Sequence, residues 1–171
     1  EGRLIFANGC YRLFYRDMKF GLEAGHLNPW VPNDFVLAFC QDIATRLGVR
    51  EGPFKIDLAF HPVFGPCLLE CATRLSGGFD HMFTAPLATG KDITGAMLDY
   101  SLGLGINHEK LQSKKGGYAC ALAPIYPPGR IKGWRKPDET PKGVRQIIIR
   151  EMVEIKQPRD CAGCPAFVIA E

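Results

Sequence analysis

Several features of common protein classes are missing from this sequence of 171 residues. No apolar run reaches the roughly 18 residues that a membrane span requires, and no basic start followed by an apolar segment marks a signal peptide. The 21 basic residues are scattered and the net charge is +3, so the sequence lacks the basic stripe of a nucleic-acid-binding protein. We therefore expect neither a membrane nor a nucleic acid as a partner.

The seven cysteines form no regular framework of the kind that disulfide-rich secreted domains have. Their odd number favours reduced thiols, and we expect a cytoplasmic protein. Cys161 and Cys164 form a C-x-x-C pair, but no second pair completes a zinc site, and the sequence assigns this pair no role.

The composition is that of a globular protein, with 46% hydrophobic and 23% charged residues. The 19 glycines and 13 prolines predict many turns and short strands. Glu1 stands in place of an initiator Met, and the chain stops at Glu171 after the apolar run 166–170. We expect the chain to be cut out of a longer polypeptide.

Helical periodicity is clearest at residues 34–47, where Asn33 is the expected N-cap and Gly48 the residue after the last turn. Its apolar stripe, expected to pack in the core, consists of Phe35, Phe39, Ile43 and Leu47. A second helix is predicted from Asp92, its cap, to about Leu102. The side chains expected to point inward from it are Ile93, Met97 and Leu98.

Strand and turn patterns cover much of the rest. Residues 3–24 predict two strands joined by a turn at Asn8-Gly9. Residues 25–29 and the Gly-rich residues 76–91 are predicted to be loops. Four strands are expected in the last third, at 118–124, 130–134, 144–150 and 165–170.

Residues 53–74 predict a β-hairpin that carries polar side chains. A four-residue turn ending before Pro66 would place His61 opposite that proline. The same register places Asp57 directly opposite Glu70.

The two faces of this hairpin differ in character, because side chains alternate along a strand. The apolar face, expected against a core, holds Phe54, Ile56, Leu58, Phe60, Cys67, Leu69 and Cys71. The polar face holds Lys55, Asp57, His61, Glu70 and Arg74. A register slip of one residue would bury these charges, so the register is well determined.

Two carboxylates directly opposite each other are destabilising unless something neutralises them. With Cβ atoms roughly 4.5–5.5 Å apart, Asp57 and Glu70 could share a Mg²⁺ bound at about 2.0–2.1 Å from each ligand oxygen. Magnesium often takes one or two carboxylates and keeps its other positions for water and phosphate. The alternative is a salt-bridge network of Lys55, Asp57, Glu70 and Arg74 without a metal.

A Gly-rich segment follows Arg74. Two adjacent glycines, Gly77 and Gly78, allow a ligand to approach the backbone closely. Ser76 and the neighbouring amides could bind an anion such as phosphate or carboxylate.

Residues 70–78, with the sequence ECATRLSGG, resemble the E-x-N-x-R segment of ATP-grasp enzymes and the L-S-G-G continuation of amino-acid-ligase-like members. Asp57, thirteen residues upstream, resembles the first metal carboxylate of that family. The resemblance covers about residues 20–105, and the strands beyond about residue 118 resemble the small β-rich tail of such ligases more loosely.

The resemblance implies an α+β fold. Residues 1–112 would be the C-terminal part of an ATP-grasp domain, an antiparallel sheet with flanking helices. Residues 113–171 would be a small, truncated β-rich subdomain. The missing N-terminal part of the same chain would then be a partner, and the sequence leaves a homodimer open.

The resemblance also implies an ATP-dependent ligase that activates a carboxylate as an acyl phosphate and joins it to an amine. Asp57 and Glu70 would hold Mg²⁺ or Mn²⁺ with ATP, and Lys55 would contact the nucleotide or pair with these acids. Arg74 would be catalytic, stabilising the acyl phosphate or orienting the carboxylate. The substrate contacts would be Arg74, Ser76, Gly77, Gly78 and His81.

Two departures from the family pattern open alternatives. Ala72 stands at the Asn ligand position, and the family's nucleotide-clamping lysines and flap are not in this chain. The chain alone is expected to bind ATP weakly and to turn over nothing. Ala72 favours a non-catalytic metal- or nucleotide-binding relative, and an unrelated α+β domain with structural salt bridges is the third reading. His26 is expected to be a hydrogen-bonding loop residue.

Overall fold

The computed structural model describes residues 2–16, 22–124, 126–135, 137–151, 154–155 and 164–171. The fold is α+β, as the sequence predicts. Its helices are α1 (Asp34–Arg46), the π-helical turn η1 (Asp80–Thr84), α2 (Ala85–Thr89), α3 (Ile93–Ser101) and the 3₁₀ turn η2 (His108–Leu111). Its strands are β1 (Gly9–Phe14), β2 (Glu23–Trp30), β3 (Lys55–His61), β4 (Gly65–Ala72), β5 (Ala119–Leu122), β6 (Gly129–Arg130), β7 (Val144–Ile149), β8 (Glu154–Ile155) and β9 (Ala166–Ala170).

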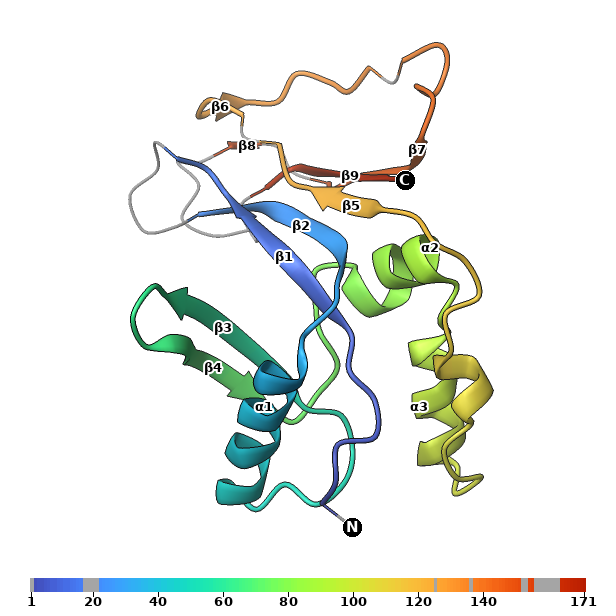
Figure 1. Cartoon of the computed structure of the whole chain (residues 1–171). Coiled ribbons are helices and arrows are strands. Elements are labelled where there is room, and N and C mark those ends of the chain that lie inside the picture. Colours follow the sequence, from blue (N-terminus) through green and yellow to red (C-terminus); the bar gives the residue numbers. More distant parts are fainter. Residues whose placement is uncertain (1, 17–21, 125, 136, 152–153, 156–163) are drawn as a thin grey trace.

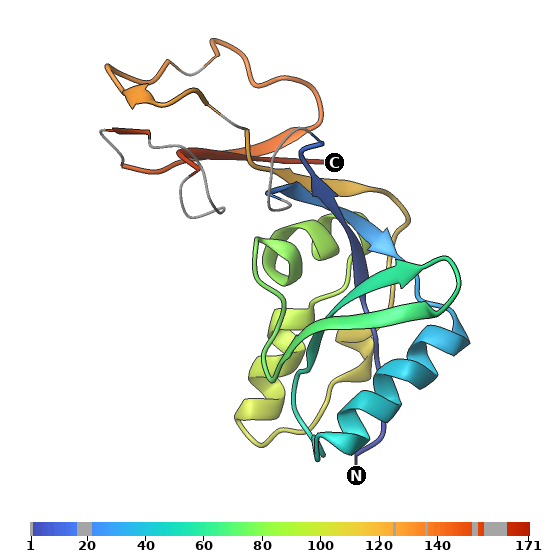
Figure 2. The ribbon, with the colours of Figure 1, turned by 90° about the vertical axis from the view of Figure 1, so that its left-hand side faces the viewer.

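Five strands form one antiparallel sheet in the order β1-β2-β5-β9-β7. The strands β3 and β4 form a separate hairpin, and β6 pairs with β8. In Figure 1 the five-stranded sheet lies above the hairpin and α1. The helices α2 and α3 lie to the right of the hairpin and α1 in this view. Figure 2 shows the hairpin next to α1, where a Cβ atom built on Gly65 would lie 3.5 Å from the Phe35 ring.

The N-terminal strands differ from the prediction. β1 begins at Gly9, so the turn predicted at Asn8-Gly9 is wrong, and its partner is β2. Residues 25–29, predicted to be a loop, lie in the middle of β2. Asn28 is buried and hydrogen-bonded there, and Gly25 lies against the backbone of β5. These tertiary contacts override the local turn preference of the residues.

The helix predicted at 34–47 is confirmed as α1. Its N-cap is Asn33, whose Oδ1 accepts a hydrogen bond from the Val36 amide at 3.0 Å. The predicted apolar stripe is only partly buried: Ile43 is in the core, but Phe35 and Leu47 are 65% and 57% exposed. The buried side of α1 is formed by Val36 and Ile43, so the helix contacts the fold along a narrower face than the stripe indicates.

The loop predicted at 76–91 is wrong, because η1 and α2 occupy most of it. Thr84, Ala85 and Ala88 are completely buried. Their small side chains allow these turns to pack closely against β2 and β5. Packing supplies the stability that the short local sequence does not.

The second predicted helix is confirmed as α3. The Asp92 carboxylate accepts a hydrogen bond from the Gly95 amide at 2.8 Å, which caps the helix. Ile93 is buried as predicted, but Leu98 is 59% exposed, so its predicted inward orientation is wrong. Ala96 takes the buried position instead.

The last third supplies three strands of the main sheet. The strands predicted at 118–124, 144–150 and 165–170 correspond to β5, β7 and β9. The strand predicted at 130–134 is wrong beyond Arg130, where β6 ends. The sheet combines strands from both sides of the predicted boundary at residues 112–113. The division into two parts at this boundary stays a prediction, and both parts would contribute strands to the same sheet.

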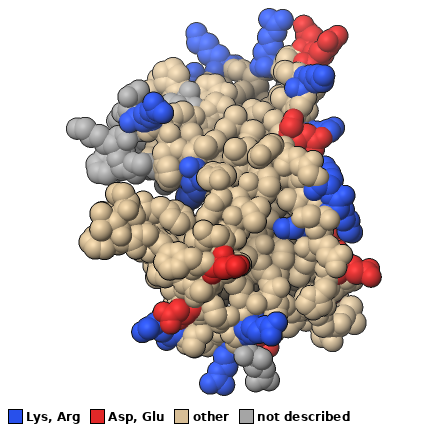
Figure 3. All heavy atoms as spheres, in the orientation of Figure 1, with Lys and Arg blue, Asp and Glu red and all other residues tan. Residues whose placement is uncertain are grey.

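The core of this region is a small cluster of Ala123, Cys164 and Phe167, with Phe79 and Ile148 packed against it. Cys161 lies outside the described residues, so the C-x-x-C pair is untested. Among the described residues, no helix has the length and apolar character needed to cross a bilayer. Figure 3 shows basic and acidic side chains interspersed around the edges of one face, with a largely uncharged centre.

Candidate metal and substrate site

The hairpin brings the two predicted metal carboxylates together. Asp57 pairs directly with Glu70 across β3 and β4. The Lys55 ammonium lies 2.6 Å from Asp57 Oδ2 and 3.0 Å from Glu70 Oε1. Both acids therefore face the same side of the hairpin, close enough to contact one cation.

The register differs from the prediction toward the turn. It shifts by one residue after Asp57, so that Leu58 pairs with Leu68 and His61 pairs with Gly65. Leu69 is the extra residue of this β-bulge. Leu69 is 68% exposed and Phe60 55% exposed. The prediction that the whole apolar face is buried is therefore wrong.

Two arginines complete the charged group around the carboxylates. Arg12 Nη1 donates to Asp57 Oδ2 at 2.6 Å, and Arg12 Nη2 pairs with Glu23 on β2. Arg74 Nη2 lies 4.0 Å from Glu70 Oε1. Arg12 was not predicted, because its contact with Asp57 joins residues 45 positions apart and no local sequence pattern marks it.

These residues fit a magnesium ion in one respect. A single cation, the Lys55 ammonium, already contacts both carboxylates, so one oxygen of each acid lies within 3.0 Å of the same point. In the described part of the chain, no group of three or more His, Cys, Asp or Glu residues could hold a metal alone. A two-carboxylate site suits Mg²⁺ that is also bound by water and phosphate oxygens. The ion pairs of the salt-bridge alternative are present as well.

The Gly-rich segment lies beside β2. A Cβ atom on Gly78 would lie 3.6 Å from the His26 ring, whereas one on Gly77 would meet no atom within 4 Å. His81 Nδ1 is hydrogen-bonded to the Ser76 carbonyl oxygen. His81 therefore holds the turn of this segment, and its predicted contact with substrate stays a prediction.

A buried polar group, which we name the Asn28 cluster, supports the Gly-rich segment. It consists of His26, Asn28, Asp80 and Thr84, which are 0–6% exposed. Asn28 Nδ2 donates to Asp80 Oδ1 at 2.8 Å and to Thr84 Oγ1 at 2.9 Å, and His26 Nε2 lies 2.8 Å from Thr84 Oγ1. His26 thus lies in a strand, not in the predicted loop. The cluster joins β2 to η1, which begins two residues after Gly78.

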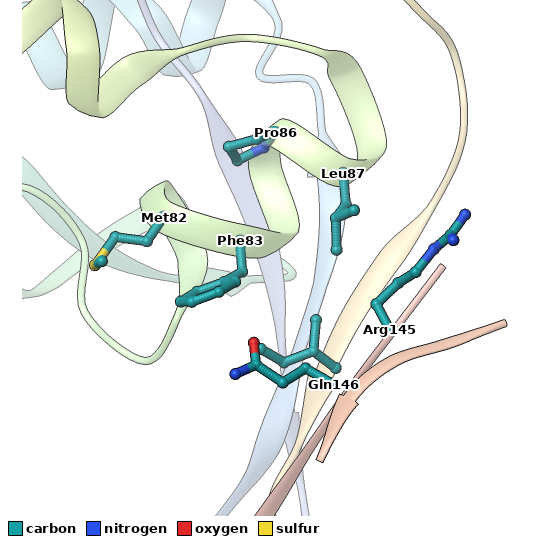
Figure 4. Close-up of a pocket in the computed structure, with 7 residues that line it drawn as sticks. Met82, Phe83, Pro86, Leu87, Arg145 and Gln146 are labelled. Carbon is teal, nitrogen blue, oxygen red and sulfur yellow. The ribbon is translucent and has the colours of Figure 1, made fainter. Parts of the chain in front are cut away.

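Two cavities lie near these elements. One of about 190 Å³ lies between β2 and the Gly-rich segment, lined by Glu23, Gly25, His26, Gly78, Ala121, Ala123 and Phe167. The other, of about 280 Å³, is shown in Figure 4 and is lined by Met82, Phe83, Pro86, Leu87, Arg145, Gln146 and Ile169. The smaller cavity adjoins the predicted substrate segment, whereas the larger one contains none of the predicted site residues.

Cys10, in β1, is not suited to act as a nucleophile. Burial, with smaller contributions from Asp80, Glu23 and Asp57, raises the pKa of Cys10 to about 12. The thiolate is the reactive form of cysteine. Cys10 therefore stays protonated and unreactive at neutral pH.

The Asn28 cluster makes stability depend on pH through His26. Burial lowers the pKa of His26 below its ordinary value of 6.5, against the opposing effects of Asp80 and Glu23. Below about pH 6.5 the unfolded chain binds a proton that the folded chain excludes, so stability falls as the pH decreases.

Chemical denaturation of the wild type and His26→Gln at several pH values measures this effect. The wild type should lose up to about 1.4 kcal/mol more per pH unit than His26→Gln below about pH 6.5. Equal slopes for the two proteins would contradict the prediction. Because slopes are compared, a constant cost of the substitution cancels.

No family model matches the sequence, and no curated protein is significantly similar to it. Solved structures do match its fold. The crystal structure of phosphoribosylglycinamide synthetase from Anaerococcus prevotii matches 99% of this chain with a TM-score of 0.78 and 14% identity. L-amino acid ligase from Bacillus licheniformis matches 93% with a TM-score of 0.67 and 14% identity.

A third match is the biotin carboxylase domain of Hydrogenobacter thermophilus 2-oxoglutarate carboxylase, whose structure contains MgADP and bicarbonate. It matches 86% of this chain with a TM-score of 0.56 and 16% identity. The matches cover 45%, 42% and 34% of the three solved chains, so this chain spans less than half the length of each. The chain thus has the fold of part of an ATP-grasp enzyme, as its sequence motifs predict.

Proposed function

We propose that this chain is the part of an ATP-dependent carboxylate–amine ligase that binds the metal and the carboxylate substrate. The pairing of Asp57 with Glu70 around one cation is the observation that carries the proposal. The fold of ATP-grasp enzymes supports it. The proposal also includes the substrates and the activity of a complete protein. It further includes assembly as a homodimer or with a further ATP-binding part.

Each site residue has a role in this proposal. Asp57 and Glu70 would hold Mg²⁺ or Mn²⁺, which neutralises phosphate charge when it is bound with ATP. Lys55 contacts both acids and would extend the same positive charge toward a phosphate. Arg74, at the edge of this group, would neutralise the reacting carboxylate.

The substrate would lie beside the Gly-rich segment. A Cβ atom on Gly77 would meet no atom within 4 Å, so a ligand could approach the backbone there. The adjoining cavity of about 190 Å³ is large enough for a small acyl group. His81 would keep this segment in place through its bond to Ser76.

Titration of Mn²⁺ into the 171-residue chain tests the metal site. We expect binding by the wild type, and binding weakened roughly tenfold or more in Asp57→Asn and Glu70→Gln, because each change removes one anionic ligand. Asp42→Asn is the matched control, since Asp42 pairs with Arg46 on α1 and is 57% exposed. If Asp57→Asn and Asp42→Asn bind Mn²⁺ equally well, these carboxylates serve only in ion pairs.

A second candidate is a metal- or nucleotide-binding relative without turnover. Ala72, opposite Lys55, stands where the family motif has a metal-binding Asn, and this favours weaker metal binding. ADP release in the presence of ATP and candidate carboxylates and amines separates the two candidates. The assay requires a chain that also carries the nucleotide-clamping part, and release that never exceeds background would favour the second candidate.

A further inference from the structure

Arg12 connects two acids that belong to different parts of the site. Its Nη1 atom lies 2.6 Å from Asp57 Oδ2, and its Nη2 atom pairs with the Glu23 carboxylate. The exposed fractions of the side chains are 40% for Arg12, 22% for Glu23 and 13% for Asp57. The guanidinium is therefore held between two partly buried carboxylates, where solvent screening is reduced.

The two acids have separate surroundings. Asp57 pairs with Glu70 in the hairpin, whereas Glu23 lines the cavity of about 190 Å³. Arginine has several donors in a planar fork, so one guanidinium can serve both carboxylates at once. Arg12 is thus a single positive charge shared between the candidate metal site and the candidate substrate cavity.

This shared charge must affect metal binding. A cation next to a carboxylate stabilises its negative charge and repels a second cation. Lys55 and Arg12 both contact Asp57 Oδ2, so Oδ1 is the oxygen that could ligate a metal while these ion pairs persist. Any weakening of the Arg12–Glu23 pair would leave the guanidinium more strongly on Asp57.

We propose that Arg12 is a positioning residue that couples the two sites: the Glu23 carboxylate shares the charge of Arg12 with Asp57 and so limits how far that charge lowers the metal affinity of Asp57. The proposal rests on the metal site of the proposed function. A ligand that engages Glu23 would then weaken metal binding through Arg12. The coupling depends on the charge of Arg12, which the planar fork of the guanidinium brings to both carboxylates.

Metal affinity in Arg12 variants of the full chain measures the coupling. By calorimetric titration, Arg12→Gln should bind Mn²⁺ on the order of threefold to tenfold more tightly than the wild type, because a competing charge is removed. Arg12→Lys keeps the charge but not the fork, and its affinity should lie between those of Arg12→Gln and the wild type. Arg46→Gln removes the same charge from the exposed Asp42 pair on α1 and should leave the affinity unchanged.

A double-mutant cycle tests the link to Glu23. Glu23→Gln should weaken Mn²⁺ binding roughly threefold when Arg12 is present, and clearly less when it is combined with Arg12→Gln. Circular dichroism and thermal unfolding of each variant confirm that the compared proteins are folded.

The outcomes separate this inference from the proposed function. If the wild type binds Mn²⁺ and Arg12→Gln binds it equally well or more weakly, the coupling is overturned but the proposed metal site is not. Weaker binding by Arg12→Gln would mean that Arg12 orients Asp57. An additive cycle would overturn the link to Glu23. Absence of Mn²⁺ binding in both the folded wild type and folded Arg12→Gln would overturn the inference and the proposed metal site together.

Discussion

Replacing Gly25 with alanine is expected to destabilise the fold by roughly 3–5 kcal/mol, combining backbone strain with overpacking. Gly25 has a φ angle of +146°, which residues with a Cβ atom rarely adopt. A Cβ atom there would lie 2.0 Å from the carbonyl oxygen of Ala121. Because β2 pairs with β5 at this point, the substitution must push apart two strands in the middle of the sheet.

Urea denaturation followed by circular dichroism measures the loss. The matched control is Gly48→Ala, at the end of α1, where φ is +71° and a Cβ atom would meet nothing within 4 Å. This control should cost only about 1 kcal/mol. Similar losses for the two variants would show that the close approach of β2 to β5 contributes little.

Replacing Asn28 with alanine should have the second largest effect, a loss of about 2–4 kcal/mol. Asn28 is completely buried, and its amide donates to Asp80 and to Thr84. Its removal leaves a carboxyl group and a hydroxyl in the interior without this donor. Among the described residues, every buried side-chain nitrogen or oxygen has a hydrogen-bond partner. The substitution would therefore create unpaired buried polar atoms where the wild type has none.

The same denaturation measurement tests this prediction. Asn8→Ala is the control, since Asn8 Nδ2 donates a single longer bond, of 3.3 Å, to Asn28 Oδ1, and it should cost less than about 1 kcal/mol. The double variant Asn28→Ala/Asp80→Ala should lose less than the sum of the two single losses, because both partners of the bond are then absent. Strict additivity would contradict the assigned role of the Asn28–Asp80 bond.

The sequence predicted the elements whose signals are local. The helices at 34–46 and 93–101 are preceded by the capping residues Asn33 and Asp92, which lie one position from the first helical residue. The hairpin follows from alternation on two strands joined by a short turn, so the pairing of Asp57 with Glu70 could be predicted. These features depend on residues fewer than about twenty positions apart.

Most of the features that the sequence did not predict depend on distant residues. Gly25 and Asn28 have the composition of a turn, and only contacts with β5 and η1 explain why they lie in a strand. Arg12 reaches Asp57 across 45 positions. The bulge at Leu69 changes the register by one residue, and an alternating pattern gives no sign of it.

The order of the strands has a consequence for biosynthesis. β9 lies between β5 and β7 in the sheet, although it follows both in the sequence. On the ribosome, β7 therefore emerges before the strand that it must pair with. The edge of the sheet assembles only after residues 166–170 have been translated, and such late, non-local pairing is among the slower steps of folding.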